Sequence, residues 1–212
     1  PSDYMIERLI QEDLIQKLDK DKITCMDELV DAVKGLPYDP NNEYSIPYFW
    51  GTVGIVYDKT KVSEADLEKE GYNIFLDTKY KGDIYLYDSE RDSFMMALKA
   101  LGYSMNTTKE REINEAYQWL LEQREEMNPV YVGDESIDTM ISGVKAMAIM
   151  YSGDAAAVMS ENPNMGYYMP KEGTNVWFDG FVISKECKQT KLANEFINYM
   201  ISDKVSYKNT VE

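Results

Sequence analysis

The sequence predicts an α/β fold in which helices and strands alternate along the chain. Apolar residues recur at helical spacing in several segments, and short apolar runs of strand length separate these segments. No internal repeat, heptad array or low-complexity tract interrupts the alternation. The 212 residues, of which 44% are hydrophobic, supply enough apolar surface for one medium domain or two small lobes.

The first part of the chain predicts a helix, an extended segment and a second helix. Apolar residues from Met5 to Leu18 fall on one side of an amphipathic helix. The turn residues 39–42 precede an apolar and aromatic segment, Tyr44 to Tyr57, which we expect to be buried and extended. Ser63 is spaced to cap a short helix that ends near Gly71.

The middle of the chain has the order strand, loop, helix. Ile84 to Tyr87 has the composition of a strand. Ser89 and Asp92 then form a capping box for a helix that Gly102 stops.

Two more helices are expected before the last third of the chain. Thr107, with Glu110 three residues later, is spaced to cap the first, and the second runs from about Ser136 to Ile141. The first helix is expected to have an inner face formed by Ile113, Ala116, Tyr117, Leu120 and Leu121.

The last third begins with an expected central strand, because Ala146 to Met150 is entirely apolar. A helix starting near Ala155 and a short strand from Gly166 to Met169 follow it. A strand from Phe181 to Ile183 and an amphipathic helix from Leu192 to Met200 are expected to close the chain.

The composition excludes several kinds of mechanism and partner. The chain has no histidine, which removes Ser-His-Asp and Cys-His catalysis and His-ligated metal sites. Its formal net charge of −16 disfavours nucleic acid and anionic membranes and favours cationic ligands, unless the acidic surface only maintains solubility. No P-loop, nucleophile elbow or dinucleotide-binding motif occurs, so no cofactor is predicted. Cys25 and Cys187 leave one disulfide open.

The chain contains no recognisable targeting segment. No apolar run approaches the length of about 18 residues that a membrane span needs, and no signal peptide is present. Since the sequence starts at Pro1 without an initiator Met, we expect a fragment or processed product, and any export signal would lie upstream.

Candidate functional residues follow two of the predicted strands. Ser89 and Asp92 come after the first of these strands, and Tyr151 and Asp154 come after the second. Open α/β sheets bind ligands at the carboxyl ends of their strands. Both aspartates also fall at helix starts, where capping and interaction with the helix dipole are the alternative roles.

Trp177 and Asp179 form a third candidate. They fall between the turn at Gly173 and the predicted strand at 181–183, where no helix cap accounts for Asp179. The alternative is a solvated loop carboxylate beside a core tryptophan. Three carboxylates with aromatic rings suit an alkylammonium ion, which forms charge-assisted hydrogen bonds and cation–π contacts.

Four segments of the chain resemble the spermidine/putrescine-binding proteins of polyamine ABC importers. The most specific are residues 38–52 and the Lys171-Glu172-Gly173 turn that leads to Trp177 and Asp179. Residues 1–4 and 79–82 also match, so the resemblance spans nearly the whole chain.

The resemblance implies an α/β periplasmic-binding-protein fold of the second class, in which two lobes joined by crossing strands close on a ligand. It assigns residues 1–51 to part of lobe one, residues 52–175 to lobe two, and residues 176–212 to a return into lobe one. It also implies that lobe one is incomplete in this chain, because the family's opening strands and a C-terminal segment with ligand contacts are missing.

The resemblance carries roles to individual residues. Ser2 and Tyr4 match residues that line the cleft in lobe one, and Trp177 matches an aromatic wall. Asp92 matches an acidic residue placed against an amino group, and Asp179 matches the most persistent carboxylate of the family.

At three further positions the residue differs from that of some or most family members. Tyr151 stands where relatives usually have tryptophan. Asp154 resembles the putrescine-type members, and Ser89 replaces an aspartate of some spermidine binders. These last two residues slightly favour a diamine.

The implied function is that of an extracytoplasmic solute-binding protein that captures putrescine or spermidine and delivers it to an ABC permease. It would act in the periplasm, or lipid-anchored on the outer face of a Gram-positive membrane, without catalysis and without a nucleic-acid partner. Two alternatives stay open: a protein of the same fold for an iron complex, amino acid or sugar, and an acidic enzyme with a carboxylate pair.

Overall fold

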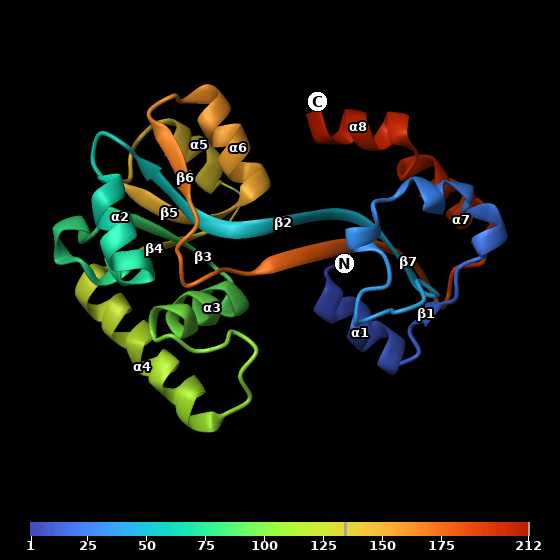
Figure 1. Cartoon of the computed structure of the whole chain (residues 1–212), viewed down its shortest axis with the longest axis horizontal. Coiled ribbons are helices and arrows are strands. Elements are labelled where there is room, and N and C mark those ends of the chain that lie inside the picture. Colours follow the sequence, from blue (N-terminus) through green and yellow to red (C-terminus); the bar gives the residue numbers. More distant parts are fainter. Residues whose placement is uncertain (134, 212) are drawn as a thin grey trace. The chain divides into compact units, whose positions relative to one another are not determined.

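In the computed structural model the chain forms two compact units, and the structure describes residues 1–133 and 135–211. Unit 1 consists of Pro1–Trp50 and Trp177–Glu212, and unit 2 of Gly51–Val176 (Figure 1). Strands β2 (Ser45–Asp58) and β7 (Val176–Ser184) carry the chain from one unit to the other.

Unit 2 is built on a mixed sheet in the order β6-β2-β5-β3-β4. Strand β3 is parallel to β4 and β5, whereas β2 is antiparallel to β5 and β6. The carboxyl ends of β3, β4 and β5 therefore lie at the same edge of the sheet. The elements are α2 (Glu64–Glu70), η4 (Gly71–Leu76), η5 (Thr78–Tyr80), β3 (Ile84–Tyr87), α3 (Glu90–Ala100), α4 (Glu110–Met127), β4 (Val130–Val132), α5 (Ser136–Ile141), β5 (Met147–Tyr151), α6 (Ser152–Glu161) and β6 (Met165–Tyr168).

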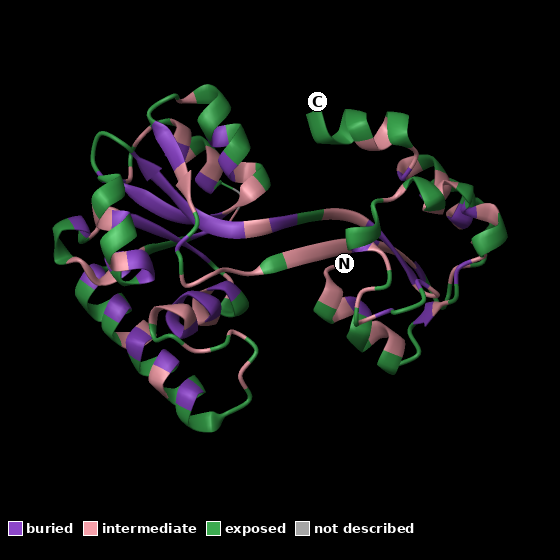
Figure 2. Cartoon of the chain, viewed as in Figure 1, coloured by how far each residue is buried: buried purple, intermediate pink, exposed green. Residues whose placement is uncertain are grey.

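The sheet of unit 2 is covered by helices, with α3 and α4 packed together and α5 and α6 packed together (Figure 1). Strands β3 and β5 are buried almost throughout, as Figure 2 shows. A strand buried on both faces favours an uninterrupted apolar sequence, which is what the run from Ala146 to Met150 has. The predicted central strand is thus confirmed.

Local signals at helix ends in unit 2 are also confirmed. The Ser63 hydroxyl accepts a hydrogen bond from the Asp66 N–H at 3.1 Å, and Gly71 ends α2 with a φ of 54°. The Ser89 hydroxyl accepts from the Asp92 N–H at 3.3 Å, which caps α3.

Unit 1 has a smaller core. Its central cluster gathers apolar residues from β2, β7, α7 and the segment before β2, with Ile46, Ile183 and Ile197 each at most 3% exposed. Strand β1 pairs antiparallel with β7. The elements of unit 1, besides β2 and β7, are α1 (Asp3–Gln11), β1 (Ile15–Gln16), η1 (Lys20–Lys22), η2 (Thr24–Glu28), η3 (Asp31–Val33), α7 (Thr190–Met200) and α8 (Asp203–Val211).

The first helix is shorter than predicted. It ends at Gln11, because Asp13 takes a left-handed conformation with a φ of 54°. The N–H groups of Asp13 and Leu14 then donate to the carbonyls of Ile10 and Leu9, which terminates the helix. The prediction that the helix extends to Leu18 is wrong.

The predicted inner face of α4 is only partly confirmed. Ala116 is buried and Leu120 and Leu121 are half-buried, but Ile113 and Tyr117 are 37% and 49% exposed. The buried residues of the helix are Glu112, Ala116, Trp119, Gln123 and Met127. Because Glu112 and Gln123 are polar, the spacing of apolar residues along the sequence does not reveal this buried face. The predicted Thr107 cap is absent, because α4 begins at Glu110 and Lys109 takes the N-cap position. The Thr107 hydroxyl instead accepts from the Lys109 N–H at 3.2 Å and donates to Glu112 Oε2 at 2.6 Å.

Three smaller differences concern the last third of the chain. Helix α6 begins at Ser152 rather than near Ala155. Trp177 and Asp179 lie inside β7 rather than in a loop before it. Helix α8 was not predicted, since it has no buried face to give its sequence a periodic pattern.

Candidate ligand-binding site

Unit 2 brings four of the predicted site residues to one edge of its sheet. Strands β3 and β5 are parallel neighbours that end at Tyr87 and Tyr151. Helices α3 and α6 start directly after them, which places Ser89, Asp92 and Asp154 at the same edge. We call Tyr87, Ser89, Asp92, Tyr151 and Asp154 the unit-2 cluster.

The unit-2 cluster contains two tyrosine-to-aspartate hydrogen bonds. The Tyr151 hydroxyl donates to Asp92 Oδ2 at 2.8 Å, and the Tyr87 hydroxyl donates to Asp154 Oδ2 at 3.0 Å. The two rings lie 4.8 Å apart between centroids, at an interplanar angle of 49°. Each strand end is thereby tied to the helix that follows the neighbouring strand.

The alternative roles at the helix starts are present beside these contacts. Ser89 caps α3, and Asp154 lies in the first turn of α6, where its charge interacts favourably with the helix dipole. Asp92 also lies in a first turn, yet its side chain is only 5% exposed and accepts the Tyr151 hydroxyl. Capping therefore accounts for the Ser89 hydroxyl but not for the Asp92 carboxylate.

The Tyr151 phenol stays protonated in this environment. Burial is the main cause that raises its pKa, and its hydrogen bond to Asp92 raises the pKa further. The hydroxyl is therefore a donor to Asp92 at neutral pH, and the carboxylate is the acceptor.

Unit 1 brings Ser2 and Asp179 together. The Ser2 hydroxyl donates to Asp179 Oδ1 at 2.7 Å, and the two residues form an antiparallel bridge. The Gly180 N–H donates to the Pro1 carbonyl at 3.0 Å beside it. Ser2 occupies the N-cap position of α1, but its side chain makes no capping hydrogen bond and donates to Asp179.

The other two predicted residues of unit 1 lie near this pair in the fold. Trp177 is two residues before Asp179 on β7, so their side chains project from the same face of the strand. Tyr4 lies in the first turn of α1 and is 43% exposed. We call Ser2, Tyr4, Trp177 and Asp179 the unit-1 cluster.

Two tyrosines, one within the unit-2 cluster and one beside the unit-1 cluster, were not predicted as site residues. Tyr87 belongs to the unit-2 cluster, as described above. In unit 1, burial raises the pKa of Tyr38 to about 12, and the nearby Asp3, Asp39 and Asp179 carboxylates raise it as well. The position of Tyr87 at a strand end was a usable signal, whereas Tyr38 is brought near Asp179 only by the fold.

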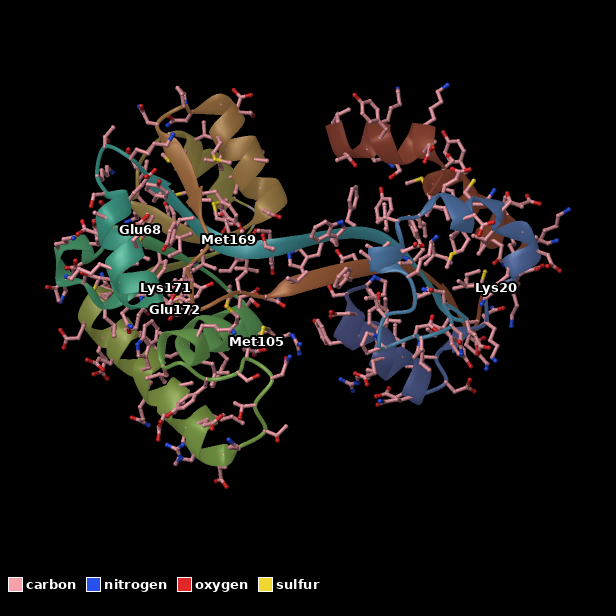
Figure 3. All side chains as sticks on the ribbon, in the orientation of Figure 1. Lys20, Glu68, Met105, Met169, Lys171 and Glu172 are labelled. Atoms are coloured by element: carbon pink, nitrogen blue, oxygen red, sulfur yellow. The ribbon has the colours of Figure 1, made fainter. Side chains whose placement is uncertain are left out.

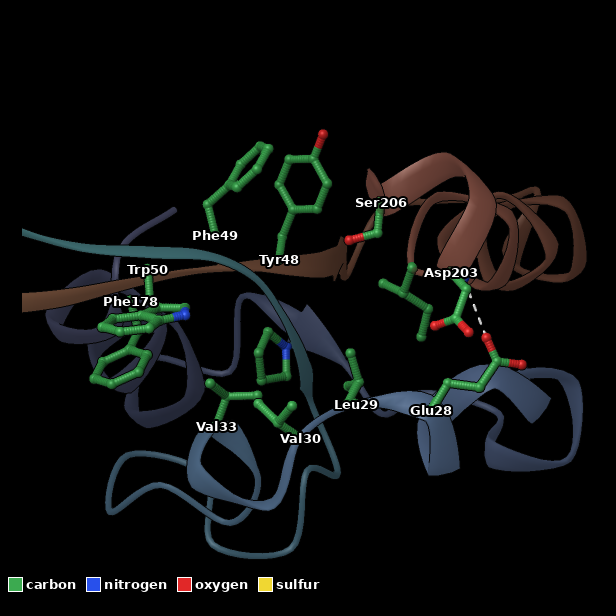
Figure 4. Close-up of a pocket in the computed structure, with 12 residues that line it drawn as sticks. Glu28, Leu29, Val30, Val33, Tyr48, Phe49, Trp50, Phe178, Asp203 and Ser206 are labelled. Atoms are coloured by element: carbon green, nitrogen blue, oxygen red, sulfur yellow. Dashed lines mark hydrogen bonds between the residues drawn. The ribbon is translucent and has the colours of Figure 1, made fainter. Parts of the chain in front are cut away.

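A separate pocket in unit 1 contains none of the eight predicted site residues. It is a hollow of about 210 Å³, open to solvent, and the stacked rings of Trp50 and Phe178 line one side of it (Figure 4). Phe178 projects from the face of β7 opposite to Trp177 and Asp179. The carboxylates of Glu28 and Asp203 lie at the other end.

The Lys171-Glu172-Gly173 turn packs against the end of α2 in unit 2. Lys171 Nζ donates to the Glu68 carbonyl at 3.5 Å, and Glu68, Lys171 and Glu172 lie close together in Figure 3. Gly71 has a φ of 54°, which favours glycine, and a Cβ there would also displace the end of the Glu172 side chain, whose Oε1 would lie 2.5 Å away. The turn therefore fixes the start of the segment that leads to β7.

The residues that the structure describes form no metal site, no disulfide and no membrane-spanning helix. No group of three or more Cys, Asp or Glu side chains in residues 1–133 and 135–211 is placed to hold a metal ion. Both cysteines are free thiols. No helix in these ranges is long and apolar enough to cross a membrane.

Comparison with known proteins identifies the family. Residues 2–207 match the family described as bacterial extracellular solute-binding protein. The chain belongs to this family. The predicted resemblance and the predicted fold class are thereby confirmed, since the structural relatives of this solute-binding protein are periplasmic binding proteins.

Several relatives of this solute-binding protein are named for polyamines. The spermidine/putrescine-binding periplasmic protein of Escherichia coli is 33% identical over 97% of this chain and 58% of its own length. The putrescine-binding periplasmic protein SpuD of Pseudomonas aeruginosa is 32% identical over 97% of this chain and 60% of its own length. These relatives are binding proteins.

A solved structure agrees with this comparison. The spermidine/putrescine ABC transporter substrate-binding protein PotD from Streptococcus pneumoniae is 35% identical, with a TM-score of 0.82. The match covers 98% of this chain and 63% of that protein. This solute-binding protein thus spans about three fifths of the length of these relatives.

Proposed function

We propose that this solute-binding protein captures a polyamine, with putrescine as the first candidate, and delivers it to an ABC permease without catalysing a reaction. The names of its relatives support the ligand class. The presence of periplasmic proteins among them supports action outside the cytoplasm.

The observation that carries this proposal is a carboxylate without a protein cation. Asp92 is 5% exposed and forms no ion pair with any residue of the described ranges. Its only side-chain donor there is the neutral hydroxyl of Tyr151. A buried carboxylate without a cation is unfavourable by several kcal/mol, so a cationic ligand would stabilise this arrangement.

The chemistry of both clusters suits primary alkylammonium groups. Each ammonium group donates up to three hydrogen bonds to carboxylate oxygens, while tyrosine and tryptophan rings can cover the methylene chain and the cation. As the family resemblance implies, we expect carboxylates of both units to bind amino groups of one ligand. The ligand would then favour the closed state through its differential binding.

Calorimetry with putrescine, cadaverine, spermidine and spermine tests the proposal. We expect Asp179→Asn and Trp177→Ala each to weaken binding at least about tenfold, or about 1.4 kcal/mol, because each removes a charge-assisted bond or an aromatic contact. Asp203→Asn is the matched control, because this carboxylate of unit 1 lines the separate pocket. We expect it to bind like the wild type.

Three results would count against the proposed function. The first is unchanged affinity in both the Asp179 and the Trp177 variants. The second is binding of an amino acid, a sugar or an iron complex in preference to all four amines. The third is turnover of a glycoside, which would indicate an enzyme with a carboxylate pair.

A further inference from the structure

Tyr87 is a buried residue at the functional edge of unit 2. It is the last residue of β3 and is 8% exposed. Its ring packs against that of Tyr151, and its hydroxyl donates to Asp154 Oδ2 on α6 at 3.0 Å. The side chain thus joins β3 to the start of α6.

The hydrogen bond from Tyr87 restricts the carboxylate of Asp154. An ionised carboxylate accepts hydrogen bonds and cannot donate them, so the phenol is the donor. An aspartate side chain rotates about two single bonds, and a hydrogen bond from a buried phenol restricts that rotation. Binding a cation to a side chain that is already ordered avoids part of the entropy loss on association.

We propose that Tyr87 is a positioning residue for ligand binding, which holds the Asp154 carboxylate in place for an ammonium group. Tyr151 holds Asp92 in the same way, so each carboxylate of the unit-2 cluster has its own tyrosine. This inference rests on the proposed function, because it assumes an amine ligand. It adds that the affinity at Asp154 depends on a residue from the neighbouring strand.

The test is a set of putrescine titrations by calorimetry on the full chain. Tyr87→Phe retains the ring and removes the hydroxyl, and we expect binding to weaken about tenfold. Tyr85→Phe is the matched control, because Tyr85 is 7% exposed on the same strand and packs in the core cluster of unit 2. We expect it to bind putrescine as the wild type does.

A double-mutant cycle separates positioning from a general structural effect. In the presence of Asp154→Asn, we expect Tyr87→Phe to cause less than about a twofold further loss. In the presence of Asp92→Asn, we expect it to cause its full loss of about tenfold. A merely structural role would weaken binding equally in both backgrounds.

The outcomes distinguish this inference from the proposed function. If the wild type binds putrescine and Tyr87→Phe binds it equally well, the inference about Tyr87 is wrong and the proposed function stands. The inference is equally wrong if the effects of Tyr87→Phe and Asp154→Asn are additive. If the wild type binds none of the four polyamines, the proposed function fails, and the inference fails with it.

Discussion

The two units of this protein differ in how much apolar surface they bury. Unit 2 buries more than three times as many apolar side chains as unit 1 within the part of the chain that the structure describes. The difference is visible in Figure 2, where the buried residues concentrate in the strands of unit 2. Unit 1 buries Ile6, Ile15, Leu18, Ile23, Val33, Ile46, Ile183, Ile197 and Ile201.

Unit 1 also leaves large apolar side chains exposed. Trp50 is 59% exposed, and Phe196 and Tyr199 on α7 are 53% and 61% exposed. Burial of apolar area is the dominant favourable term in folding, at about 25 cal/mol per Å². We therefore expect unit 2 to contribute most of the free energy of unfolding.

The same contrast holds for the two candidate clusters. In unit 2, two carboxylates are each held by a tyrosine, and the two rings are in contact. In unit 1, a single hydroxyl from Ser2 holds Asp179. The cluster on the larger core is thus the more extensively hydrogen-bonded of the two.

The largest expected effect that tests this comparison is a cavity in the core of unit 2. Ile55 on β2 is fully buried, so Ile55→Ala should reduce the free energy of unfolding by about 2–5 kcal/mol. Ile197→Ala in unit 1 should reduce it by less than Ile55→Ala does, because a small core beside solvent can collapse around the missing atoms. Urea unfolding monitored by amide hydrogen exchange measures both losses of stability and shows in which unit each occurs. An equal or larger loss for Ile197→Ala would contradict the comparison.

A smaller effect is expected at high pH. Burial raises the pKa of Tyr57 and Tyr72 in unit 2 to about 12, and likewise that of Tyr38 in unit 1. Since the unfolded phenol titrates near 10, this stabilisation is complete below pH 10 and is lost as the pH rises through 12. Each fully buried tyrosine such as Tyr72 should contribute on the order of 2 kcal/mol.

The high-pH measurement compares urea midpoints at pH 9 and pH 11.5 for each unit. Unit 2 should lose more stability than unit 1, because it contains two of these three tyrosines. Tyr72→Phe serves as the control, and it should reduce the pH dependence of unit 2. A pH-independent midpoint for unit 2 would show that these phenols titrate normally in the folded state.

Much of unit 2 could be predicted from the sequence because its signals are local. These signals involve only residues that are close together in the sequence: the serine caps at Ser63 and Ser89, the turn at Gly71 and the apolar run from Ala146 to Met150. The end of α1 was missed because it depends on a left-handed Asp13, a residue type that tolerates this conformation but does not require it. The face of α4 was only partly predicted, because the polar residues Glu112 and Gln123 are buried there.

The candidate site was only partly predictable, for a related reason. Strand ends indicated Ser89, Asp92, Tyr151 and Asp154, because the carboxyl ends of parallel strands meet at one edge. Which hydroxyl reaches which carboxylate depends on distances of about 3 Å between side chains of different elements, and no spacing along the chain encodes that. The Tyr87 to Asp154 bond is of this kind, as is the Ser2 to Asp179 bond.

The smallest expected effect compares two serines at helix starts, one in each unit. Ser89→Ala removes the cap of α3 and should reduce the free energy of unfolding by about 1 kcal/mol, as should Ser63→Ala, a cap outside the clusters. Ser2→Ala removes no cap from α1, so it should change stability by less than Ser89→Ala while weakening putrescine binding through Asp179. Urea unfolding and calorimetry on the three variants measure both quantities. If Ser2→Ala destabilised the chain as much as Ser89→Ala and left binding unchanged, Ser2 would be a structural residue of α1, and the unit-1 cluster would lose the donor that holds Asp179.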